Sequence, residues 1–171
     1  PGRELRLRDQ TDDVTGATHL HFTQLHQGLP LWGADLTLHL SPDQTPYAFN
    51  GVYYPSPAVP LPSTPSLSAA QAQATAADYL NRHPSRSQPQ PLTQGTLPGW
   101  IEAMLPADTA PQLCYWSAGP EQPLHLAWHI ETRPDWRQRW RLFVDATDGT
   151  VLEAYNNAPS EGPADAAAVG L

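Results

Sequence analysis

The stretch "HLHFTQLHQGLPLWGADLTLHL", His19 to Leu40, has the clearest pattern in this chain. From Leu31 to Leu40, apolar and polar side chains alternate, which is typical of a strand with one buried and one wet face. Only Leu31 breaks the alternation. We therefore expect a strand whose buried face consists of Trp32, Ala34, Leu36, Leu38 and Leu40.

The neighbouring segments extend this strand into an antiparallel meander. Leu20 and Phe22 share one face of the preceding strand, while His19 and His21 share the other. A further strand is predicted at 46–55. The histidines raise the question of a metal site, but polar side chains are the default on a wet strand face. The chain also has no His-Glu-x-x-His motif, so we predict no metal or cofactor here.

Composition excludes several classes of function. The 171 residues are 40% hydrophobic and include six tryptophans, which favours a packed core. The net charge of −8, with nine Lys plus Arg, argues against nucleic acid or an anionic membrane as partner. No apolar run approaches the ~18 residues of a membrane span. The single cysteine, Cys114, is expected to be a buried small hydrophobe.

A proline-rich stretch divides the chain. "YPSPAVPLPSTPS", Tyr54 to Ser66, contains five prolines and predicts a stiff, extended connector. Directly after it, Ser68 and Gln71 form the pattern of a capping box and predict the start of a helix that ends before Pro84. We divide the chain into a first module, a connector, a second module and a tail, at residues 1–55, 56–66, 67–156 and 157–171.

Four predicted strands follow the helix. They are "APQLCYWSA", "PLHLAWHIET", "RQRWRLFVDA" and "TVLEAY", and Asp148-Gly149 predicts a hairpin between the last two. Together these patterns predict an α+β fold of two small subdomains, each an antiparallel sheet, the second with one helix packed across it. Arg137, Arg139 and Arg141 would share one strand face, either as a solvated face or as a docking surface for an acidic partner.

The chain resembles a known family at these residues. The first module is similar to the fungalysin/thermolysin propeptide domain, and the second to the PepSY-type domain, which has a cystatin-like fold and follows the first in secreted thermolysin-like metallopeptidase precursors. The first likeness lies in "GATHLHFTQLHQGLPLWGADLTLHL" and Asn50-Gly51; the second in "SLSAAQA", "LAWHIE" and "WRLFVDATDGTVLEAYN". The family often has Arg at the position of His21. Because this chain has histidine there, it lacks a potential charge partner for Asp35.

The resemblance implies a function without chemistry of its own. Such prosegments are not enzymes: they assist folding of the zinc metallopeptidase domain that follows in cis, and block its cleft until autoprocessing. It implies a monomer, secreted or periplasmic after removal of a signal peptide. The abrupt start at Pro1 and the low-complexity end lead us to expect an excised piece of a longer protein. The rival interpretation is a stand-alone periplasmic or cell-surface protease inhibitor.

The tail would then have one of two roles. It has no core-forming pattern, so it is either a flexible linker or an extended strand that crosses the partner's cleft and contains or adjoins the cleavage site. Asp165 or Glu161 would approach a zinc ion in the second case. The small side chains that would fit a narrow cleft are Ala166, Ala167, Ala168 and Val169.

Overall fold

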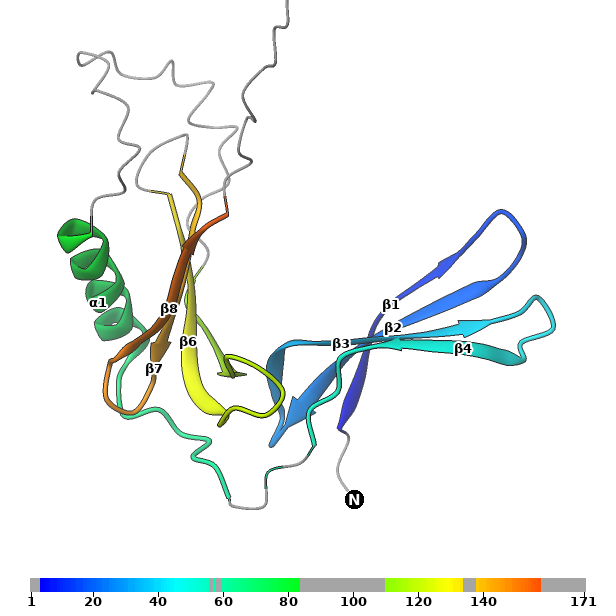
Figure 1. Ribbon diagram of the computed structural model, residues 1–171, viewed down its shortest axis with the longest axis horizontal. Helices are drawn as coiled ribbons and strands as arrows, with labels where there is room; N and C mark the ends of the chain where they lie inside the picture. The colour runs from blue at the N-terminus through cyan, green and yellow to red at the C-terminus, as the bar shows by residue number, and fades with distance from the viewer. Residues whose placement is uncertain (1–3, 56, 58–59, 84–109, 134–137, 158–171) are drawn as a thin grey trace, which may run out of the picture.

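The computed structural model describes residues 4–55, 57, 60–83, 110–133 and 138–157, which contain eight strands and one helix (Figure 1). This confirms the α+β class. The elements are β1 (Leu5–Asp12), β2 (Thr18–His26), β3 (Leu29–Leu40), β4 (Pro46–Gly51), α1 (Ala69–Arg82), β5 (Gln112–Trp116), β6 (His125–Thr132), β7 (Trp140–Asp145) and β8 (Val151–Asn156). Strand β1 was missed by the sequence analysis, although Leu5 and Leu7 alternate there with Arg6 and Arg8.

Two antiparallel sheets are joined through β3. The first sheet has the order β1-β2-β3-β4, and the second has the order β5-β6-β7-β8. Strand β3 also pairs in parallel with β5 at one position, Leu31 opposite Tyr115. The exact limits of the two modules stay a prediction.

Helix α1 begins at the residue that the sequence indicated. The Ser68 hydroxyl accepts a hydrogen bond from the Gln71 N–H at 3.3 Å, and the Gln71 amide oxygen accepts one from the Ser68 N–H at 2.8 Å. This is the expected capping box, which satisfies backbone donors that a helix start leaves free.

The helix covers one face of the second sheet (Figure 1). Ala72 and Ala76 are buried against Ile130, Leu142 and Val144. Because alanine side chains are short, the helix backbone can lie close to the sheet. On the other face of the same strands, Ala127 and Phe143 are buried as well, so both faces of β6 and β7 contribute to the core.

Strand β3 departs from the expected single face at Gly33. The φ of Gly33 is +74°, a conformation that glycine adopts without steric cost. Leu31, which broke the sequence alternation, is buried together with Ala34. Trp32 instead points to the other side, where its ring centroid lies 4.1 Å from that of His129. The prediction that Trp32 shares the Ala34 face is therefore wrong, because the backbone turns between the two residues.

The pairing of β2 with β3 breaks at the same place. Thr23 pairs with Asp35 and Leu25 pairs with Pro30, so the β3 residues between leave the ladder. Gln24 lies at the break and is buried. Its amide donates to the Tyr54 carbonyl at 2.6 Å and accepts from the Tyr54 N–H at 2.9 Å, which fixes the start of the connector.

Replacing Gly51 with alanine should destabilise the first sheet. A Cβ on Gly51, whose φ is +134°, would overlap the carbonyl oxygen of Asp35 and the Cα of Leu36. We expect a loss of about 2–4 kcal/mol in a denaturant melt. Gly28→Ala is the matched control: its φ is +83° and no atom lies within 4 Å, so it should cost only about 1 kcal/mol. Equal losses would contradict the proposed overlap.

Replacing Trp32 with alanine should weaken the junction of the two sheets. The indole packs against His129 and lies with its centroid 5.1 Å from that of Phe143. We expect a loss of roughly 3 kcal/mol in the free energy of unfolding. Tyr47→Ala, at a side chain 60% exposed, is the control and should change it by less than about 1 kcal/mol. A Trp32 loss as small as the control's would refute this packing.

Candidate docking surface

One face of the first sheet carries two cross-strand rows of apolar side chains. Residues directly opposite in an antiparallel pair point to the same face of the sheet, so the register identifies each row. The rows are Leu7–Phe22–Leu36 and Leu20–Leu38–Phe49. We call these six residues the open apolar face.

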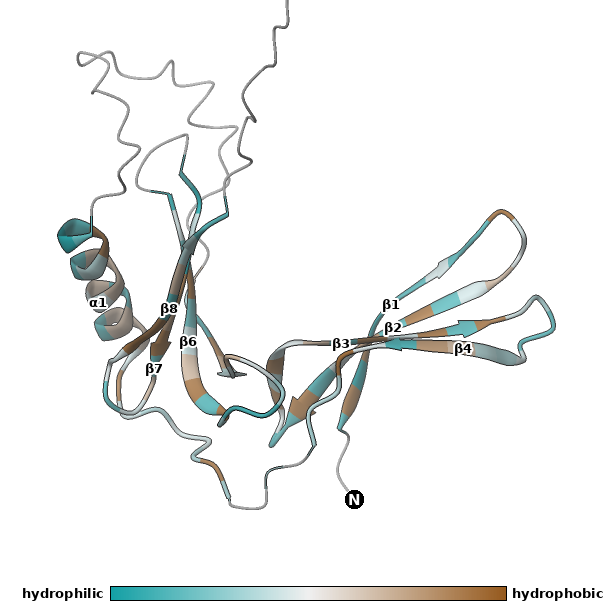
Figure 2. Ribbon diagram, viewed as in Figure 1, coloured by the Kyte–Doolittle hydropathy of each residue, from teal (hydrophilic) through white to brown (hydrophobic). Residues whose placement is uncertain are grey.

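Much of this face is in contact with solvent. Leu7 is 51% exposed and Phe49 is 61% exposed, while Leu36 is buried. In Figure 1, α1 lies over the second sheet, and no helix of the described residues lies over the first. Figure 2 shows the apolar segments alternating along these outer strands. A contiguous exposed apolar patch marks an interaction site more often than scattered apolar residues do.

The opposite face of the same sheet is polar. Asp35 accepts a hydrogen bond from the Thr23 hydroxyl at 2.9 Å and pairs with the Arg8 guanidinium at 3.3 Å. Arg8 on β1 therefore supplies the cation that His21 does not. The His21 ring lies between two hydroxyls, 3.1 Å from Thr37 and 3.4 Å from Thr11.

Two more histidines of this polar face contact each other. The Nδ1 atoms of His19 and His39 are 2.6 Å apart. His19 Nε2 lies 3.3 Å from Asp13, and His39 Nε2 lies 2.6 Å from the Asn50 side-chain oxygen. Hydrogen bonds, first from the Thr15 hydroxyl and then from its N–H, lower the pKa of Asp13 to about 2. Across the described ranges, no three His, Cys, Asp or Glu side chains gather so that they could hold a metal ion.

The two described arginines of the predicted basic face are paired within the chain. Arg139 and Arg141 contact the Glu131 carboxylate at 2.8 Å and 2.7 Å. Burial raises the pKa of Glu131, but the two arginine hydrogen bonds outweigh it and leave the pKa below its ordinary value. The Arg141 guanidinium also lies 5.5 Å from the Trp32 ring centroid. Their charge thus faces Glu131 and Trp32, and a docking role for an acidic partner stays a prediction.

Other predicted positions fall outside the described residues. These are Arg137, Glu161, Asp165, Ala166, Ala167, Ala168 and Val169. The cleft-crossing role of the tail is therefore still a prediction.

The buried groups that could do chemistry are held in their neutral forms. Burial raises the pKa of the Cys114 thiol to about 12, so the thiol stays protonated, as expected of a packed hydrophobe. Burial also lowers the pKa of His129. Its Nε2 has no hydrogen-bond partner and lies 3.8 Å from Glu131. His129 packs as an aromatic ring between the sheets.

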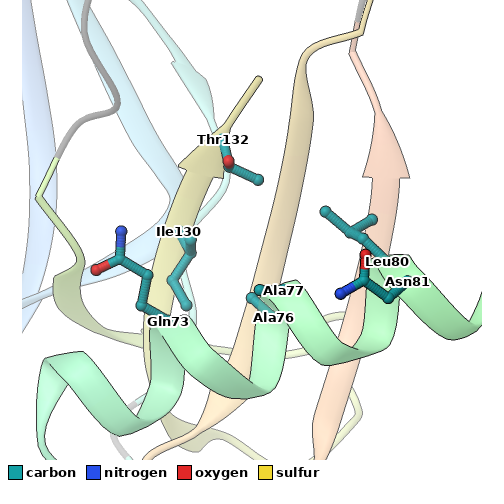
Figure 3. Close-up of a pocket in the computed structure, with 7 residues that line it drawn as sticks. All are labelled: Gln73, Ala76, Ala77, Leu80, Asn81, Ile130 and Thr132. Carbon is teal, nitrogen blue, oxygen red and sulfur yellow. The ribbon is translucent and has the colours of Figure 1, made fainter. Parts of the chain in front are cut away.

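A cavity of about 340 Å³ lies between α1 and β6 (Figure 3). Its walls contain two amide side chains, one hydroxyl and otherwise apolar groups, and none of them titrates. The cavity is lined by Gln73, Ala76, Ala77, Leu80, Asn81, Ile130 and Thr132. It offers room but no carboxylate, imidazole, thiol or amine. No described helix is long and apolar enough to span a bilayer.

Comparison with known proteins finds a family motif in the residues of the first sheet. Residues 3–53 match the Fungalysin/Thermolysin Propeptide Motif. The chain is 26% identical over 161 residues to bacillolysin of Bacillus amyloliquefaciens, and 21% identical over 156 residues to bacillolysin of Bacillus subtilis (strain 168). Each alignment covers 91% of this chain, which spans only 28% of the length of either bacillolysin.

A solved structure gives a weaker likeness. The Bacillus megaterium YpeB C-terminal domain aligns with a TM-score of 0.43 and 11% identity, over 90% of this chain and 56% of that domain. A likeness of that degree supports no conclusion about this chain. The motif and the bacillolysin similarity agree with each other: the first sheet matches the propeptide motif, and the chain as a whole is similar to part of the bacillolysins.

Proposed function

We propose that this chain is the N-terminal propeptide of a secreted zinc metallopeptidase. It does no chemistry itself; it assists folding of the peptidase domain and blocks the cleft of that domain until autoprocessing. The observation that carries the proposal is that the propeptide motif and the open apolar face lie in the same part of the chain. The propeptide motif covers residues 3–53, and the open apolar face lies within the same residues.

The open apolar face supports a role in binding a folded domain. Exposed apolar surface is unfavourable in water, and covering it contributes about 25 cal/mol per Å². A partner surface that exists only in the folded peptidase would gain this energy only after folding. Selective binding to the folded state then stabilises it by RT ln(1 + [L]/Kd), and a covalent tether raises the effective concentration to about mM.

Charge supports the same choice of surface. The six residues of the open apolar face are uncharged, whereas Arg8, Arg139 and Arg141 are paired with acids of the same chain. The chain as a whole has a net charge of −8. Docking should therefore depend on apolar burial, and its affinity should change little with salt, unlike docking through exposed ion pairs.

Replacing Phe49 with serine should weaken inhibition of a bacillolysin-type catalytic domain added in trans. The ring is 61% exposed, so its loss should leave the melting temperature nearly unchanged while removing an aromatic anchor. We expect the inhibition constant to rise about tenfold or more. Ala48→Ser is the matched control, because Ala48 is exposed on the same strand and pairs with His39 on the polar face.

The outcomes of this experiment separate the alternatives. If wild-type chain does not slow the peptidase, the inhibitor role is refuted. If both variants weaken inhibition equally, the open apolar face is not the docking surface. A reading frame that continues into a domain with a His-Glu-x-x-His motif would support action in cis, and a frame without one would support the stand-alone inhibitor.

Deleting residues 158–171 tests the role of the tail. If Asp165 and the small residues 166–169 occupy the cleft, the truncated chain should inhibit about tenfold more weakly or worse. Its melting temperature should not change, because the described strands end at Asn156. An unchanged inhibition constant would assign inhibition to the folded body alone.

A further inference from the structure

Two histidine rings face each other through like atoms on the polar face of the first sheet. His19 of β2 and His39 of β3 are direct cross-strand partners. Their Nδ1 atoms are 2.6 Å apart, and their rings meet edge-on with centroids 4.8 Å apart. Two nitrogens this close are joined by a hydrogen bond, which requires one proton between them.

The neighbours of the pair fix this proton count. The Asn50 oxygen accepts from His39 Nε2, so the neutral His39 ring has a lone pair at Nδ1. That lone pair accepts from the Nδ1–H of His19, and His19 Nε2 donates to the Asp13 carboxylate, so His19 carries a hydrogen on both ring nitrogens and a positive charge in this arrangement. Turning the Asn50 amide over reverses the Asn50–His39 and His39–His19 hydrogen bonds and leaves both rings neutral, while His19 Nε2 still donates to Asp13. In both arrangements a single proton lies between the two Nδ1 atoms.

A further proton cannot be added without breaking this contact. When both rings are fully protonated, each Nδ1 carries a hydrogen and a positive charge, and neither can accept. Two N–H groups cannot face each other at the observed distance. The rings must separate, and they are attached to neighbouring strands of the same hairpin.

His21 provides an internal contrast on the same face. Its two ring nitrogens face the hydroxyls of Thr37 and Thr11. A hydroxyl both donates and accepts, so it can rotate to suit the neutral or the charged ring. Protonation of His21 therefore breaks no contact, although His21 lies only two residues from His19.

We propose that the His19–His39 pair makes the first sheet sensitive to acid. Near neutral pH the pair holds β2 and β3 together through one shared proton. In mild acid both rings become charged, the contact opens and the outer end of the β2–β3 hairpin loosens.

The groups around the His19–His39 pair are consistent with a change between neutral pH and mild acid. Asp13 lies at the His19 end, Asn50 and the Tyr47 ring lie at the His39 end, and Thr11 stands opposite His19 on β1. The pKa of Asp13 is about 2, so this carboxylate stays ionised in mild acid and does not take up the added proton itself. In the unfolded chain the two rings are apart and both can be protonated. The unfolded state then binds more protons in acid, and stability falls as the pH falls.

Separation of β2 and β3 in acid would also alter the open apolar face. Leu20 and Leu38, the next residues along β2 and β3, belong to that face and pair with each other. Separation of the strands would disturb this row and weaken peptidase binding in acid. This consequence rests on the proposed function, whereas the change in stability does not.

The test is the melting temperature of the full chain at about pH 7.5 and pH 5, for wild type, His39→Asn and His21→Asn. The introduced amide can turn to suit either form of His19, so His39→Asn should lose less stability in acid. Between pH 7.5 and pH 5, the melting temperature of His39→Asn should fall by roughly 3 °C less than that of wild type. A difference of this size corresponds to the loss of one contact in a chain of this length. His21→Asn should behave as wild type.

Ring NMR titration of wild type gives a second readout that needs no variant. The two rings should take up protons in two separate, coupled steps, and the β2–β3 amide signals should shift with the second step. Equal acid-induced drops in wild type and His39→Asn, or independent single-step titration of both rings, would overturn the proposal. Absence of peptidase inhibition would refute the proposed function and leave both of these readouts unaffected.

Discussion

The structure depends on the turn of β3 at Gly33. At this residue the backbone takes a positive φ, so Leu31 and Ala34 enter the core of the second sheet while Trp32 points to its other side. Leu31 then pairs with Tyr115, and the Trp32 ring packs against His129 and under Arg141. One strand thereby joins two sheets that otherwise have separate hydrogen-bond ladders.

This arrangement leaves the two sheets with different surfaces. The second sheet is covered by α1 on one face, and Trp32 of β3 packs against the other. The first sheet has no helix over it within the part of the chain described, and its apolar rows meet solvent at Leu7 and Phe49. The stable second sheet can thus hold the first sheet in place while an apolar face stays available for a partner.

Polar groups in both sheets are largely balanced within the chain. Glu131 pairs with both Arg139 and Arg141, Arg8 pairs with Asp35, and the Trp116 indole donates to Glu153. The Arg8–Asp35 pair is exposed, and such pairs contribute little to stability, so its main effect is to fix side-chain direction. With these arginines paired, the proposed docking would depend on apolar burial and not on their charge.

Sequence pattern alone determined the α+β class, the capping box at Ser68, the helix and the β7–β8 hairpin at Asp148-Gly149. These features are local: each follows from side-chain period or from the chemistry of a cap or turn. Only the tertiary structure decided which way Trp32 points, that Glu131 pairs with two arginines, and that His19 meets His39. The reason is that an alternating pattern assigns faces only while the strand is regular, and cross-strand partners depend on a register set by distant residues.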